Sequence, residues 1–194
     1  MIKKIRILFF SLISISSAIL IFGCKSNPQD NTSLKSIEVL KTYASYNAWA
    51  NDEFINWLKE KDTLCLTDSI PSSFSTIKNN LTHLWGAEIG WLQTLRGEDW
   101  DVPKNLSKNK SISETLEGFS KTTNELKNYI KKLKPEDFIN KKQLSKGEVS
   151  ADHILIHILN HASYHRGQIV TIARNLKITD PPRTDFIYYV SSVK

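Results

Sequence analysis

The sequence predicts an all-α protein that folds as an antiparallel four-helix bundle. Four segments of roughly twenty residues or more carry apolar side chains at intervals of three and four, which places those side chains on one face of a helix. No segment between them shows the alternation of apolar and polar residues that predicts a β-strand. Helices with one apolar face each are expected to bury those faces against one another.

The first two helices are predicted from this periodicity and from their stop signals. The first covers residues 33–61. The second begins near Ser73 or Ser75 and ends before Gly97, because glycine readily adopts the left-handed conformation that closes a helix. Residues 99–110 are polar and are predicted to form a loop.

The other two helices have clearer boundaries. The third opens at the capping box Ser111–Glu114 and ends before Pro135, which cannot continue a helix. Residues 136–149 are predicted to be a connection, and the fourth helix covers residues 150–176. The tail, residues 180–189, is expected to be extended and to pack against the bundle.

The N-terminus has the layout of a bacterial lipoprotein signal. A basic start precedes an apolar run over Leu8–Phe22 that is short for a spanning helix. Ile21–Cys24 (IFGC) resembles a lipobox, which implies cleavage before Cys24 and a lipid on its sulfur. The alternative is an uncleaved anchor helix.

These segments divide the chain into three parts and predict its location. We expect a signal peptide at 1–23, the lipidated cysteine and a polar tether at 24–32, and the helical bundle at 33–194. The protein would be exported and held on a bacterial membrane, on the periplasmic side or at the cell surface. With Cys24 acylated, Cys65 has no disulfide partner and is expected to be a small apolar residue.

The charge distribution argues against nucleic acid as a partner. The formal net charge is +6, and three of the cationic residues lie in the predicted signal. The remaining lysines are scattered among acidic residues and asparagines instead of forming a basic stripe.

The fourth predicted helix carries three histidines at intervals of four. This spacing stacks His157, His161 and His165 on one face, where two neighbouring imidazoles can reach one metal ion. His83 on the second helix is the natural third ligand, and His157 could replace one of the pair. Imidazole ligands without a carboxylate or thiolate favour Zn²⁺ or Ni²⁺. His153 is expected to be exposed.

The surroundings of His83 suggest how a neighbour could approach the site. Ala87, Gly90 and Thr94 continue its face as a stripe of small residues, which would let another helix come close. Three tryptophans, Trp49, Trp85 and Trp91, are expected near the site and could line an apolar pocket, although tryptophan at helical spacing usually belongs to the core.

Four segments together resemble the DinB family, the YfiT-like group of four-helix bundles. They are YNAWAN at 46–51, LTHLWGAEIGWL at 81–92, HILNHASYHRGQ at 157–168 and PRTDF at 182–186. The resemblance implies one divalent metal ion held by His83, His161 and His165, and often a homodimer. Family members of known activity are thiol-dependent transferases and isomerases.

Three functional hypotheses follow from the site and the resemblance, and the third is a purely structural metal in a bundle whose surface binds a partner. The first is a metal-dependent enzyme, either a transferase that uses a low-molecular-weight thiol or a hydrolase that uses metal-activated water. The second is a non-catalytic, lipid-anchored bundle that binds a metal or a small ligand. The weak candidates for a helper in catalysis are His157, Glu88, Tyr164 and Gln168. Glu88 and Gln168 are otherwise expected to hold neighbouring helices together, and Arg166 to pair with a carboxylate or cap a helix end.

Overall fold

The computed structural model describes residues 28–104, 106, 108 and 110–193. The predicted signal peptide and Cys24 lie outside the described residues. The elements in chain order are α1 (Pro28–Lys59), α2 (Ile77–Arg96), α3 (Ile112–Lys132), α4 (Pro135–Ile139), β1 (Lys141–Leu144), β2 (Gly147–Ser150), α5 (Ala151–Asn175) and α6 (Phe186–Ser192). The predicted all-α bundle is therefore confirmed, with a two-stranded hairpin as its β-structure among the described residues.

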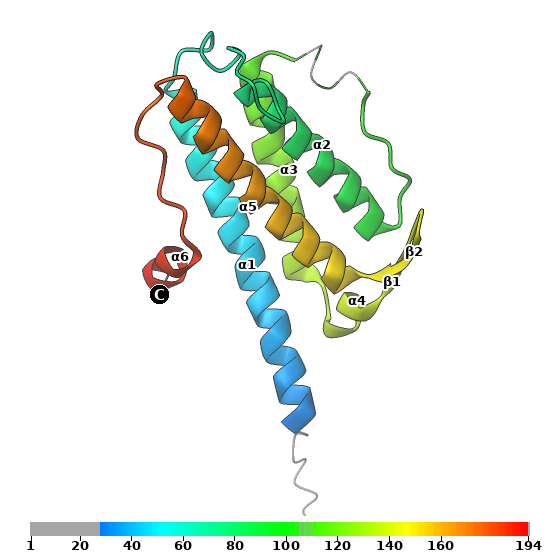
Figure 1. The fold of residues 1–194 in the computed structure, drawn as a ribbon. Helices are drawn as coiled ribbons and strands as arrows, with labels where there is room; N and C mark the ends of the chain where they lie inside the picture. Colours follow the sequence, from blue (N-terminus) through cyan, green and yellow to red (C-terminus); the bar gives the residue numbers. More distant parts are fainter. Residues whose placement is uncertain (1–27, 105, 107, 109, 194) are drawn as a thin grey trace, which may run out of the picture.

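The four long helices form the bundle, with each helix packed mainly against two others (Figure 1). α1 packs against α3 and α5, and α2 also packs against α3 and α5. α2 and α5 run in opposite directions, whereas α2 and α3 run in the same direction. The reason is the connection after α2, whose described residues return along that helix: Trp100 lies beside Gly90, and Val102 and Leu106 lie beside Gly86.

The helix ends follow the capping signals closely, with two differences. Gly97 has a left-handed backbone (φ 77°), and the capping box of Ser111 and Glu114 is present. α2 begins at Ile77, later than predicted, because Thr76 supplies the N-cap hydroxyl. α1 begins at Pro28, so residues 28–32 of the predicted tether continue the helix; proline is compatible with the first helical position.

The predicted connection 136–149 and the predicted extended tail were both wrong in part. Residues 135–139 form α4, and residues 141–150 form the antiparallel hairpin β1–β2, whose turn uses the positive φ of Gly147 (130°). Strands of four residues are too short to show a clear alternation. In the tail, residues 186–192 form α6, and the ring of Phe186 packs edge-on against Tyr43 and Tyr46 of α1.

Two apolar clusters fill the bundle, one toward each end. One contains Phe54, Leu81 and Phe119, and the other contains Leu92, Leu126 and Ile158. Cys65 is half-buried at the edge of the first cluster, and its thiol donates to the carbonyl of Asp62 (2.8 Å), as suits a packing residue. Between the clusters lies a layer of buried polar side chains that joins all four helices.

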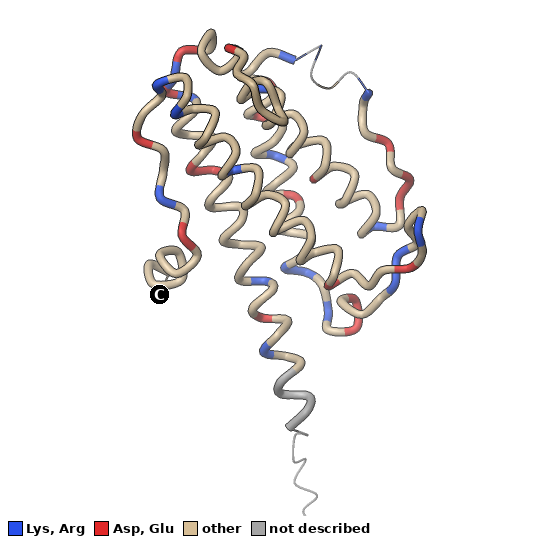
Figure 2. Tube along the Cα trace, viewed as in Figure 1, with Lys and Arg blue, Asp and Glu red and all other residues tan. Residues whose placement is uncertain are grey.

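Lysine and arginine positions are interspersed with aspartate and glutamate positions along the described chain, and no helix carries a long unbroken run of basic residues (Figure 2). α3 ends with Lys131 and Lys132, where cations interact favourably with the helix dipole. None of the helices in the described part of the chain is long and apolar enough to cross a membrane.

Candidate metal centre

The structure brings together three of the histidines singled out in the sequence: His83 of α2 and His161 and His165 of α5. One ligand nitrogen from each lies within 4.8 Å of the others. Nε2 of His161 is 3.1 Å from Nε2 of His83 and 3.1 Å from Nε2 of His165. The site is positioned by the antiparallel contact of α2 and α5, because the two α5 histidines lie one turn apart and face α2.

This arrangement fits a divalent cation. Two nitrogens bound to one zinc ion at tetrahedral angles lie about 3.3–3.4 Å apart, close to the separations found between these imidazoles. Nδ1 of His165 is buried without a hydrogen-bond partner by distance among the described residues, and Nε2 of the same ring is the nitrogen that faces His161. Three neutral imidazoles without a carboxylate form a donor set suited to zinc or nickel.

The electrostatics of the cluster keep these imidazoles neutral. Burial, together with repulsion from the neighbouring histidines, lowers the pKa of His161 and that of His165 to about 4. Burial also lowers the pKa of His83. At neutral pH an arriving cation therefore has no imidazolium proton to displace.

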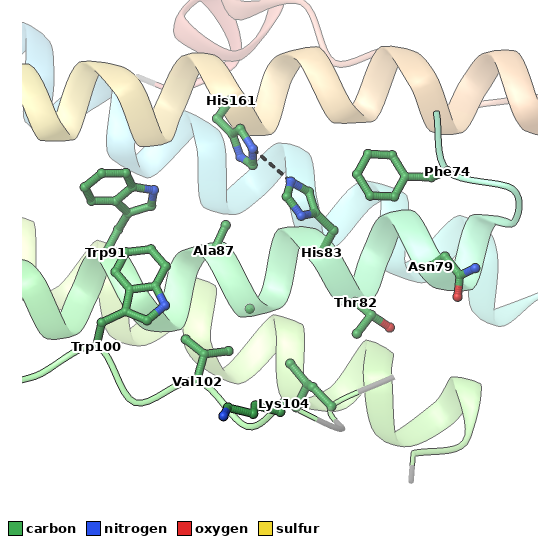
Figure 3. Close-up of a pocket in the computed structure, with 12 residues that line it drawn as sticks. Phe74, Asn79, Thr82, His83, Ala87, Trp91, Trp100, Val102, Lys104 and His161 are labelled. Atoms are coloured by element: carbon green, nitrogen blue, oxygen red, sulfur yellow. Dashed lines mark hydrogen bonds between the residues drawn. The ribbon is translucent and has the colours of Figure 1, made fainter. Parts of the chain in front are cut away.

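A groove with a volume of about 620 Å³ opens onto His83 and His161 (Figure 3). Phe74 closes one end, where its ring packs against His83 with a centroid distance of 4.7 Å. Trp91 and Trp100 close the other end, with ring centroids 5.3 Å apart at an interplanar angle of 84°. The centre is exposed on this side, because His83 is the most exposed of the three histidines.

The opposite side of the groove comes from the α2–α3 connection, which the sequence analysis treated only as a loop. Val102, Lys104 and Leu106 line it. The connection is held against α2 by Gln93, whose amide donates to the carbonyl of Asp101 (3.2 Å) and accepts from its backbone N–H (3.0 Å). Trp100 and Lys104 were missed because nothing in a polar loop sequence shows that it folds back over a helix.

The remaining histidines and two of the weak helper candidates lie around the cluster. His153 is exposed, as expected. His157 is exposed, and its ring packs edge-on against Trp91 (4.9 Å) instead of joining the three nitrogens. Tyr164 is also exposed, and its ring packs against that of His165 from outside the groove, with a centroid distance of 5.2 Å. Gln168 accepts a hydrogen bond from Asn80 (3.3 Å) and so links α5 to α2.

The fourth weak candidate, Glu88, is fully buried in the polar layer and does not line the groove. Its carboxylate accepts hydrogen bonds from Asn51 (3.2 Å) and Thr123 (2.6 Å). Arg166, next to His165 in the chain, donates to the amide oxygens of Asn47 (2.8 Å) and Asn51 (2.7 Å). Arg166 therefore reaches Glu88 through Asn51, and the network fixes the relative positions of α1, α2, α3 and α5.

Two expectations about the surroundings of the site were wrong. Trp49 packs against Tyr188 and Tyr189 of α6, and Trp85 donates to Thr122 of α3, so only Trp91 of the three expected tryptophans lines the groove. The stripe of small residues on α2 does not admit a neighbouring helix at Gly90. The indole ring of Trp100 occupies that space, since a Cβ on Gly90 would lie 2.3 Å from its atoms.

Comparisons with known proteins agree with this architecture. The sequence model of the DinB family matches residues 30–191, which include the three clustered histidines. Protein DinB of Bacillus subtilis (strain 168) is 28% identical over 162 residues, which cover 77% of this chain and 92% of that protein. YizA, an uncharacterized protein of the same organism, is 27% identical over 150 residues, which cover 75% of this chain and 92% of YizA.

Proposed function

Since the chain belongs to the DinB family, we propose that it is a metal-dependent enzyme that binds one zinc or nickel ion through His83, His161 and His165. The observation that carries the proposal is a cluster of three imidazoles, two of which, those of His83 and His161, line an open groove. A purely structural zinc site would be closed by four protein ligands, whereas catalytic sites keep one position for water or substrate.

The composition of the groove supports a reaction in which the ion itself activates the nucleophile. No carboxylate lies among the described residues that line the groove, so these residues include no aspartate or glutamate that could act as a general base. A bound divalent ion would supply Lewis acidity, which lowers the pKa of a thiol or of water. We therefore propose a transferase that uses a low-molecular-weight thiol, or a hydrolase. The role of the protein would be to hold the ion with neutral ligands and to orient a substrate along the groove.

The proposal is tested by metal content and by four single-histidine variants. The purified protein is expected to contain about one zinc or nickel ion per chain, measured by elemental analysis after dialysis. H83A and H161A are expected to lose the ion, because two imidazoles alone hold it too weakly. H153A and H157A serve as matched controls on the same helix as His161, and both should retain the ion.

Activity is then compared between metal-free and reloaded protein on panels of thiol-transfer and ester or amide substrates. Turnover that disappears with a chelator and returns with the metal would support an enzyme. If H83A and H161A keep the same metal content as H153A, the assignment of the ligands is wrong. If the metal binds but no substrate reacts, the non-catalytic binding function becomes the better interpretation.

We further propose that the protein is exported and anchored by a lipid on Cys24. The apolar run Leu8–Phe22 and the lipobox-like residues Ile21–Cys24 support this proposal. Two acyl chains would give stable anchoring, which one chain does not. The intact mass of protein from the membrane fraction should correspond to a chain that begins at a diacylglyceryl-modified Cys24. C24S should show an unmodified chain that begins at Met1. An unmodified wild-type chain beginning at Met1 would instead indicate an anchor helix.

A homodimer, which the family resemblance implies, is also proposed. Light scattering of the purified protein would measure its oligomeric state directly.

A further inference from the structure

The end wall of the groove is a pre-organised aromatic surface. The six-membered ring of the Trp100 indole lies directly against Gly90, and the indole meets Trp91 edge-on. Trp91 is supported in turn by the ring of His157, and the backbone next to Trp100 is fixed through Gln93. Because both indole rings are already held in place, a ligand that packs against them orders few further groups.

The charged side chain that lines the groove is a cation, and no anionic side chain is among its described lining residues. Lys104 is the one lysine, arginine or acidic residue among the described residues that line it. On the other side of the groove lie His83 and His161, and the three neutral imidazoles of the centre would leave a bound divalent ion with its full charge. The acidic residues Glu98 and Asp99 lie beyond the tryptophan pair, where they line a different pocket. The groove is therefore suited to a negatively charged group.

We infer that the groove selects a small organic anion with a flat apolar body, whose anionic end meets the metal centre and whose body packs against Trp100 and Trp91. This inference rests on the proposed metal site and adds a substrate class to it. Trp100 is the specificity-determining residue, and Lys104 contributes attraction for the negative charge. A volume of about 620 Å³ has room for a ligand the size of a substituted aromatic acid.

The test uses the full chain in lipid nanodiscs, loaded with Co²⁺, because the visible spectrum of the ion reports ligands at the metal centre only. Three probes are titrated at neutral pH: phenylacetate, acetate and 2-phenylethylamine. The dissociation constant of phenylacetate is expected to be at least about tenfold lower than that of acetate, because burial of the phenyl ring adds to the same carboxylate contact. The protonated amine should leave the spectrum unchanged.

Variants then separate the aromatic wall from the metal site. W100A should bring the constants for phenylacetate and acetate within about threefold of each other, while the constant for acetate and the cobalt spectrum stay unchanged. G90A keeps the tryptophan but displaces its ring, and should reduce the selectivity in the same direction. W49A is the control, because this indole packs against α6 and should leave the selectivity intact.

For the cationic residue, K104Q should raise the dissociation constants of phenylacetate and acetate by a similar factor of about two to five, as expected for the loss of one exposed charge. K108Q is its control, since Lys108 is exposed nearby but does not line the groove.

The outcomes distinguish this inference from the proposed function. If the chain takes up no Co²⁺, the proposed metal site fails, and the inference fails with it. If the cobalt spectrum forms and depends on His83 and His161, but phenylacetate and acetate bind equally, the metal site stands and the aromatic selectivity is wrong. Equal selectivity in W100A and the wild type would likewise overturn the role of Trp100.

Discussion

Replacing Arg166 with methionine is expected to lower the free energy of unfolding by about 3–5 kcal/mol, the range for removal of one partner from a buried charged network. The side chain is 4% exposed, and its guanidinium binds the amide oxygens of Asn47 and Asn51 and the hydroxyl of Ser163. Methionine fills much of the volume but leaves these acceptors without donors and the buried Glu88 without its neighbouring cation. Urea denaturation of the chelator-treated protein measures the loss without a contribution from bound metal.

The control for this prediction is a double-mutant cycle with Glu88. R166M combined with E88Q removes both charges, so the double variant should lose less stability than the sum of the two single variants. Purely additive losses would mean that Arg166 and Glu88 do not interact, and that Arg166 acts by packing alone. A loss below about 1 kcal/mol for R166M would show that water replaces the missing donors.

The helices could be predicted because local periodicity and capping determine them, whereas the choice of His161 over His157 in the histidine cluster came from the family resemblance. His161 and His165 share a helix face through their spacing, and Gly97, Ser111 and Pro135 mark helix boundaries by their backbone chemistry. The choice of His83 as the third residue needed only two helices whose apolar faces meet. These features depend on residues that are close in the sequence, or on one contact between long elements.

The groove and the polar layer depend on long-range contacts that no local pattern reveals. Trp100 reaches Gly90 only because the described part of the connection after α2 turns back along that helix. Asn51 and Thr123 are fully buried polar residues, but nothing in the local sequence distinguishes them from exposed asparagines and threonines. The aromatic residues of the tail form a helix because they pack on α1, where tertiary contacts outweigh local propensity.

The contribution of Glu88 to stability is expected to fall by about 3 kcal/mol between pH 4.5 and pH 7.5, as follows from a pKa shift of this size. Burial raises the pKa of Glu88 from 4.5 to about 7, against the smaller effects of Thr123 and Arg166. The folded protein therefore binds more protons than the unfolded chain between these values. The stabilisation is complete below the unfolded pKa and is lost as the pH rises through 7.

The measurement compares the wild type with E88Q, because other groups titrate in the same range. The lowered pKa values of His161 and His165, about 4 each, act in the opposite direction: metal-free protein loses stability as the pH falls from 6.5 to 4. Both proteins share this histidine contribution, so it cancels in the difference between their free energies of unfolding. That difference should shift by about 3 kcal/mol in favour of E88Q as the pH rises. Parallel pH profiles would mean that Glu88 titrates normally, and that the buried layer holds a carboxylate whose charge is fully compensated by Arg166 and its amide partners.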